Sequence, residues 1–161
     1  MKTILLATDG SPSAQLATSE AIEIATATGW PLRVVTVWNR PIPTGYGYAV
    51  YPLPADLAEL ERDHAQTIAA ASVQQAVEAG VTATFELREG LPAEEICAAA
   101  AETASTLIVI GAHGWGTFKR LLFGSVSTHV IHAAKCPVLV VRAEETPLET
   151  PPEQVAAGTS A

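Results

Sequence analysis

The chain has 161 residues, of which 48% are hydrophobic and 16% charged, and its mean hydropathy is +0.26. This length suits one domain, and this composition can bury a core, which excludes a wholly disordered chain. The net charge of −8 and pI of about 4.9 argue against a nucleic-acid partner, since nucleic-acid-binding proteins usually carry a basic excess. No apolar run approaches the roughly 20 residues that a membrane-spanning helix needs, so no membrane partner is expected.

The N-terminus and the cysteines indicate the compartment. The apolar run after Lys2 ends at Asp9, too early for a signal peptide, so we expect a cytoplasmic protein. Cys97 and Cys136 lie far apart in sequence and have no metal-type spacing, and they are interpreted as reduced core residues.

The first predicted elements are a strand and a helix. Residues 2–8 form a short apolar run that reads as a buried strand. Ser11 is a suitable N-cap and Pro12 suits the first turn of the following helix, which Gly29 can end. The helix has apolar residues near helical spacing at Ala14, Ala17, Ala21, Ile24 and Ala25.

The next segment is a valine-rich strand, a proline-rich stretch and a long helix. Residues 32–38 are the strand. Residues 39–54 contain four prolines and three tyrosines, a proline density that excludes a regular helix. Residues 55–79 predict a helix whose apolar stripe is Leu57, Leu60, Ile68 and Ala71.

The remaining pattern repeats strand and helix and ends on a strand. Predicted strands are residues 81–88, 106–110 and 137–142, and predicted helices are residues 91–104 and 125–134. Apolar strands that alternate with helices favour an α/β fold, a doubly wound five-stranded parallel sheet with helices on both faces. We expect residues 1–142 to form this domain and residues 143–161, rich in Glu, Pro and Thr, to form a flexible tail.

Charge is unevenly distributed along this acidic chain. Residues 107–142 contain no Asp or Glu, although they carry the cations Lys119, Arg120, Lys135 and Arg142. A region free of carboxylates is what an anion site requires. Buried strands without charge explain part of this pattern, but they do not explain the cations between them.

A glycine motif follows the fourth predicted strand. Gly111 and Gly114 are separated by two residues, and nine residues separate Gly114 from Gly124-Ser125. Glycines let the main chain approach a ligand closely, and Gly124-Ser125 opens a helix whose first N–H groups favour a phosphate. The sequence lacks both the P-loop pattern and the dinucleotide fingerprint.

These motifs resemble the ATP-binding branch of the universal stress protein family over about residues 1–142. The resemblance rests on the glycine motif, on the opening ILLATDGS and on the closing CPVLVV. It implies a fold similar to that of adenine nucleotide alpha hydrolases. It also implies ATP as the ligand, with Mg²⁺ on the triphosphate, and a homodimer through the last strand, from Pro137 to Arg142.

The resemblance also assigns roles to individual residues. Adenine and ribose would lie against the ends of the first, second and fourth strands, and Asp9 would accept from a ribose hydroxyl. The phosphates would lie against the glycine loop and the helix that starts at residue 125. The implied cofactor-binding residues are Ala7, Thr8, Asp9, Val37, Ile110, Gly111, His113, Gly114, Gly124, Ser125, Val126 and Ser127.

Several residues in and near this set have alternative interpretations. Asp9 could cap the turn before the first helix, and the glycines could be ordinary loop residues. His113 could be a general acid or base instead of a phosphate contact, but no paired carboxylate is apparent. His129 and His132 are three residues apart on a predicted helix, but no third metal ligand is apparent. Lys119 and Arg120 could contact phosphate or lie on a solvated surface.

Three functions follow from these observations. The leading one is a dimeric, ATP-binding regulatory module of the stress response, with no catalytic residues assigned. The alternatives are a slow Mg²⁺-dependent ATP hydrolase and a nucleotide-free interaction scaffold. AMP or another adenylyl ligand could replace ATP, because the strand ends and Asp9 would contact only adenosine.

Overall fold

The computed structural model describes residues 2–39, 45–46, 49–50, 56–115 and 123–142. Its centre is a five-stranded sheet in which every neighbouring pair of strands is parallel. The strands, in spatial order, are β5 (Ala83–Glu89), β2 (Leu32–Trp38), β1 (Ile4–Ala7), β6 (Leu107–Gly111) and β7 (Val138–Val141). The predicted parallel α/β fold is confirmed, with strand ends that differ from the expected ones by at most two residues.

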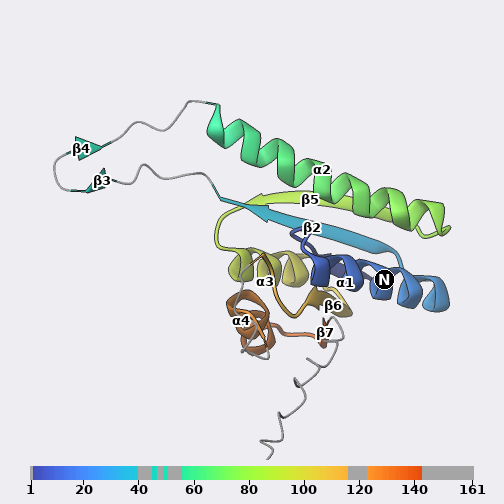
Figure 1. Ribbon diagram of the computed structural model, residues 1–161. Helices are drawn as coiled ribbons and strands as arrows, with labels where there is room; N and C mark the ends of the chain where they lie inside the picture. The colour runs from blue at the N-terminus through green and yellow to red at the C-terminus, as the bar shows by residue number, and fades with distance from the viewer. Residues whose placement is uncertain (1, 40–44, 47–48, 51–55, 116–122, 143–161) are drawn as a thin grey trace, which may run out of the picture.

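Four helices cover the two faces of this sheet (Figure 1). They are α1 (Pro12–Thr28), α2 (Leu57–Glu78), α3 (Pro92–Glu102) and α4 (Ser125–Ala133). Helices α1 and α2 pack on one face and α3 and α4 on the other, which divides the buried residues into two clusters. The central strands of the sheet are therefore largely shielded from water on both sides, whereas the edge strand β5 keeps exposed residues such as Phe85.

Strand β1 shows how one apolar run supplies both cores. Ile4 and Leu6 point to the cluster under α1 and α2, and Leu5 and Ala7 point to the cluster under α3 and α4. All four are buried because successive side chains of a strand alternate between the faces. A run without polar alternation thus predicts a central strand correctly.

The first helix begins and ends as its sequence predicts. Ser11 accepts a hydrogen bond from the Ala14 N–H, and Gly29 ends the helix in the left-handed conformation at φ 71°. The buried side of α1 consists mainly of alanines, together with Ser13 and Thr18. Small side chains let the helix approach the sheet closely.

The predicted buried stripe of α2 is wrong. Its buried residues are Ala65, Ala69, Ser72 and Ala76, whereas Leu60 is 63% exposed. The small residues face the sheet, and this orientation turns Leu60 toward solvent. Ile68 is only partly buried and packs beside Gly10.

A second, two-stranded sheet lies within the proline-rich segment. β3 (Gly45–Tyr46) pairs antiparallel with β4 (Ala49–Val50), apart from the five-stranded sheet (Figure 1). The sequence excluded a helix here but gave no sign of this pairing. In the described part of the chain, no helix combines the length and the apolar character needed to cross a bilayer.

The strand order places a topological switch between β1 and β6. The chain moves from β1 outward to β2 and β5, and then returns to the other side of β1 as β6 and β7. The register pairs Ala7 with Ile110, so the carboxyl ends of β1 and β6 are adjacent. Ligands of open parallel sheets bind in the crevice outside such ends.

Candidate functional site

A pocket of about 480 Å³ opens at this switch point. All twelve residues that the sequence singled out line it, so the structure brings the whole predicted set together. They are Ala7, Thr8, Asp9, Val37, Ile110, Gly111, His113, Gly114, Gly124, Ser125, Val126 and Ser127. The volume falls in the range of small-molecule sites, about 300 to 1,000 Å³.

Six further residues line the pocket and were not predicted from the sequence: Ala14, Val35, Pro92, Ile96, Ala112 and Phe123. Val35 could have been found, because it lies two residues before Val37 on the same face of β2. Pro92 and Ile96 could not, since no local signal says which helix covers this end of the sheet.

One end of the pocket is apolar. Val35 and Val37 of β2 form one side, Pro92 and Ile96 of α3 form another, and Ile110 of β6 lies at the back. Ile96 is 4% exposed and belongs to the core cluster under α3 and α4. A flat apolar group can therefore be enclosed here between a strand and a helix.

The other end of the pocket is polar. Its main-chain segment after β6 is held in place by hydrogen bonds to serine hydroxyls. The Ser11 Oγ donates to the His113 carbonyl at 3.2 Å, and the Ser13 Oγ donates to the same oxygen. The His113 N–H in turn donates to the Ser13 Oγ at 3.1 Å. The first turn of α1 therefore fixes the loop after β6, a role beyond the capping of α1 that the sequence indicated for Ser11.

Asp9 takes part in the turn and also faces the pocket. Its Oδ1 accepts the Ser11 N–H at 3.0 Å, and its main-chain carbonyl accepts the Trp115 indole N–H at 2.9 Å. The capping interpretation therefore holds, but it occupies one oxygen of an exposed carboxylate. The other oxygen, Oδ2, lies above Gly114.

Gly111 lines the pocket, and the fold itself also requires it to lack a side chain. A Cβ on Gly111 would lie 2.6 Å from the Ser13 Oγ, 2.7 Å from the Ser13 carbonyl carbon and 2.8 Å from the Ala14 nitrogen. Contacts this short, with helix backbone, cannot be accommodated without moving α1. Gly111 is therefore glycine because β6 and α1 touch.

The remaining two glycines of the motif also face protein atoms. A Cβ on Gly114 would lie 2.6 Å from the Asp9 Oδ2, and one on Gly124 would lie 3.3 Å from the Ala112 carbonyl oxygen. The glycine spacing thus reflects the packing of three segments around the pocket.

Helix α4 begins at the pocket with no side chain capping it. Its N-cap is Gly124, whose own N–H donates to the Ala112 carbonyl at 2.7 Å. Ser125, Val126 and Ser127 follow as the first turn, where main-chain N–H groups have no partner within the helix. Such a helix end favours an anion.

Ser127 lines the pocket, but its hydroxyl is already engaged by the main chain. Its hydroxyl lies 2.9 Å from the Ala112 carbonyl and 3.0 Å from the Gly124 carbonyl, and its side chain is buried. The hydroxyl hydrogen is committed to the main chain, so this hydroxyl is not a free donor for a phosphate. The Ser125 side chain is exposed at the pocket.

Few ionisable groups face the pocket. Among its described lining residues, Asp9 and His113 are the ionisable ones, and neither Lys nor Arg is present. The described ranges contain no group of three or more His, Cys, Asp or Glu that could hold a metal ion. Lys119 and Arg120 lie outside the described residues.

The histidines of α4 and the two cysteines do not line the pocket. His129 and His132 are exposed on α4 and line a second, open hollow that shares Phe123, Gly124 and Ser125 with the pocket. Cys97 and Cys136 are free and partly buried, and burial raises the pKa of both thiols, so they remain protonated at neutral pH.

The sequence matches the model of a known protein family. The model of the universal stress protein family matches residues 1–142. A putative universal stress protein of Staphylococcus haemolyticus is 34% identical over 154 residues, which cover 94% of this chain and 91% of that protein. A universal stress protein of Thermus aquaticus is 37% identical over 143 residues, with 88% and 98% covered.

Solved structures agree with this match. The universal stress protein UspA of Lactobacillus plantarum superposes with a TM-score of 0.73 at 28% identity, covering 88% of this chain and 97% of its own. A universal stress protein in complex with cAMP gives 0.65 at 26% identity, with 87% and 96% covered. One from Archaeoglobus fulgidus in complex with dAMP gives 0.64 at 26%, with 88% and 98% covered. By sequence and by fold, this chain belongs to the universal stress protein family.

Proposed function

We propose that this chain is a nucleotide-binding regulatory module that holds an adenosine phosphate, ATP foremost, in the pocket between β1 and β6. The observation that carries the proposal is the arrangement of an apolar end and an uncapped helix N-terminus in one pocket. The relatives with cAMP and dAMP support an adenosine ligand in this fold.

Each part of the ligand has a suitable counterpart. Val37, Ile96 and Ile110 would enclose the base, and the Asp9 carboxylate would accept from ribose hydroxyls. The first-turn N–H groups of α4 would bind the phosphates. Because Asp9 is the only carboxylate among the described lining residues, Mg²⁺ would arrive on the phosphates instead of occupying a site built by the protein.

A regulatory module fits the described pocket better than an efficient hydrolase. Fast phosphoryl transfer needs a residue that positions the attacking water. It also needs cations that stabilise the transition state. Among the described lining residues, the candidate bases are His113 and Asp9, whose Oδ1 already accepts the Ser11 N–H, and there is no Lys or Arg. Phosphate release from MgATP, measured alongside binding, separates the two functions.

The sharpest test places a charge at the start of α4. Ser125→Asp suits the helix dipole and should not destabilise the fold, but its carboxylate would repel a phosphate. We expect affinity for AMP and ATP to fall by about 10-fold or more, with affinity for adenosine unchanged, in titration calorimetry. Ser125→Asn is the matched neutral control.

Two results would contradict the proposal. Wild-type protein that carries no adenine nucleotide after purification, and shows no thermal shift with adenosine, AMP or MgATP, would favour the scaffold alternative. Equal losses for adenosine and ATP in Ser125→Asp would place the phosphates elsewhere.

We also propose a homodimer through β7. Pro137 and Val141 direct their carbonyls to β6, so the alternation of the strand directs the main-chain groups of Val138 and Val140 to the open edge. The strand sequence is VLVV, without a charge to discourage pairing.

Val140→Pro removes one outward N–H, and we expect a monomer by light scattering, whereas Val140→Ala remains a dimer. Wild-type monomers at tens of micromolar would contradict this interface.

A further inference from the structure

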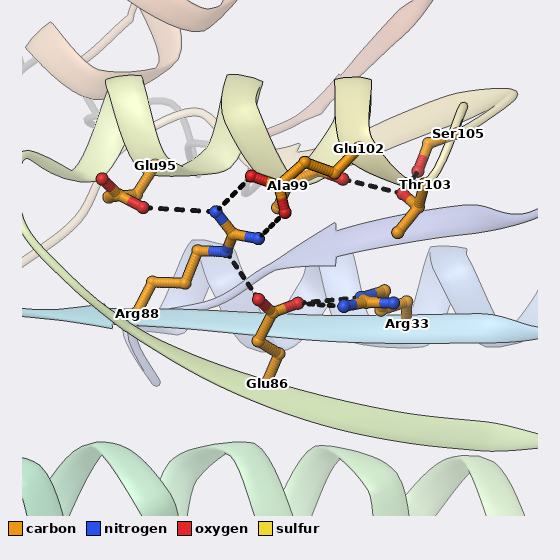
Figure 2. Close-up of polar contacts among 8 residues, drawn as sticks. All are labelled: Arg33, Glu86, Arg88, Glu95, Ala99, Glu102, Thr103 and Ser105. Atoms are coloured by element: carbon orange, nitrogen blue, oxygen red, sulfur yellow. Dashed lines mark hydrogen bonds and ion pairs between the residues drawn. The ribbon is translucent and has the colours of Figure 1, made fainter.

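A cluster of five charged side chains joins the edge strand β5 to α3 (Figure 2). Arg88 of β5 is at its centre. Its Nε donates to the Glu86 Oε1 at 2.7 Å, and its Nη1 donates to the Glu102 Oε1 at 3.2 Å and the Glu95 Oε2 at 3.4 Å. Its Nη2 donates to the second oxygen of Glu102. Glu95 and Glu102 belong to α3, so one guanidinium links the two elements.

The ion pair between Arg88 and Glu102 has the geometry of a strong arginine–carboxylate interaction. The Arg88 side chain is 13% exposed, and both of its terminal nitrogens engage the Glu102 carboxylate, the forked geometry that arginine provides. This hydrogen bonding raises the pKa of Arg88 and lowers that of Glu102, so both groups are charged at neutral pH. Removing the guanidinium would take away the cation that three carboxylates share, and Glu86 alone would keep its ion pair with Arg33.

Arg88 stands directly beside the apolar end of the pocket. In the sheet register it is the partner of Val37, which lines one side of that end. On α3, Glu95 immediately precedes Ile96 and follows Pro92 by three residues, and these two form the opposite side. The Arg88 contacts therefore connect the two sides between which the base would lie.

Packing alone specifies the placement of α3 weakly. Its buried residues are Ala93, Ile96, Ala99 and Ala100, so Ile96 is the one large side chain among them. Alanines allow close approach but form low ridges, which interlock little with the sheet below. The polar contacts to Arg88 supply a directional constraint that the alanines do not.

We propose that Arg88 is a positioning residue that sets the gap between β2 and α3, and hence the affinity of the pocket for the adenine base. This inference rests on the proposed function, because it assigns the base to the apolar end. It concerns a residue that lines no part of the pocket and that no sequence motif indicated.

Arg88→Met tests the proposal, with Arg33→Met as the matched control. Arg33 pairs with Glu86 across β2 and β5, so its ion pair lies within the sheet instead of linking the sheet to α3. We expect Arg88→Met to weaken adenosine, AMP and ATP on the order of 10-fold each, because the base contact is common to all three. Arg33→Met should bind all three like the wild type.

A gentler variant covers the case in which Arg88→Met does not fold. Glu102 is 59% exposed, and Glu102→Gln removes one carboxylate charge without leaving a buried gap. We expect a loss of about 3-fold, again equal for the three ligands.

The outcomes separate this inference from the proposed function. Three results would overturn the positioning role and leave nucleotide binding standing. They are wild-type affinity in both Glu102→Gln and Arg88→Met, a loss of affinity confined to ATP, and a loss in Arg33→Met equal to that in Arg88→Met. A wild-type protein that binds none of the three ligands overturns the proposed function itself.

Discussion

The two ends of the pocket are built on opposite physical principles. The apolar end is a gap between side chains, with Val37 on one side and Ile96 on the other. The polar end consists of main-chain segments in contact, where Gly111 leaves no room for a Cβ beside α1. We therefore expect added atoms to disrupt the polar end and removed atoms to weaken the apolar end.

Gly111→Val should have the largest effect. Its Cβ would meet the backbone of Ser13 and Ala14 within 3 Å, so the start of α1 must move. We expect the free energy of unfolding to fall by about 4 kcal/mol, measured by urea denaturation. Val35→Ala, which removes atoms at the apolar end, is the comparison variant and should lower the free energy of unfolding by less. A stable Gly111→Val protein with wild-type unfolding would refute the close contact between β6 and α1.

Ile96→Ala tests the apolar end by removing atoms. The side chain is 4% exposed, so its truncation should cost about 3 kcal/mol in unfolding free energy. Adenosine and ATP affinity should fall together, since Ile96 would face the base in the proposed binding mode. A loss seen with ATP but not with adenosine would mean that the two ends have been assigned in reverse.

Asp9→Asn tests the polar end without altering its shape. The amide oxygen can still accept the Ser11 N–H, so thermal stability should be retained. Affinity for adenosine should fall about 10-fold, because a hydrogen bond to a charged acceptor becomes a neutral one. With dideoxyadenosine, which lacks the ribose hydroxyls, we expect wild type and variant to bind equally.

Gly114→Ala should have a smaller effect that depends on Asp9. Its Cβ would displace the Asp9 Oδ2, a side-chain end that can move. We expect a few-fold loss of adenosine affinity and little change in unfolding free energy. In a double-mutant cycle with Asp9→Asn the losses should not add, whereas full additivity would separate the two residues.

The smallest effect is a pH dependence at the cluster behind the apolar end. The hydrogen bond from Arg88 lowers the pKa of Glu102 in the folded state, so its contribution to stability is full above the unfolded pKa of about 4.3. That contribution disappears as the pH falls through the lower, folded value. Urea midpoints between pH 6 and 3 should decline less steeply in Glu102→Gln, and parallel curves would contradict this.

The sequence predicted the elements well because each signal is local. Ser11, Pro12 and Gly29 mark the ends of α1 by their own backbone preferences, and the structure agrees. Apolar runs without polar alternation predicted buried parallel strands. Parallel strands share one carboxyl edge, so Asp9 and Gly111 could be expected at the same place.

What the sequence could not show depends on contacts between distant segments. Leu60 of α2 fits a helical stripe, but the face of α2 that packs on the sheet carries Ala65 and Ala69 instead. The close contact of Gly111 with α1 also requires two segments about 100 residues apart to be placed together. No local pattern contains that information.

The sequence by itself determined the strand and helix order, the parallel sheet and the group of residues at its carboxyl edge, because propensity, capping and periodicity act over a few neighbouring residues. Only the tertiary structure decided that α3 covers the pocket, that Ser13 fastens the loop after β6, and that Arg88 links β5 to α3. These features depend on distances between side chains that the chain brings together only when the sheet is complete.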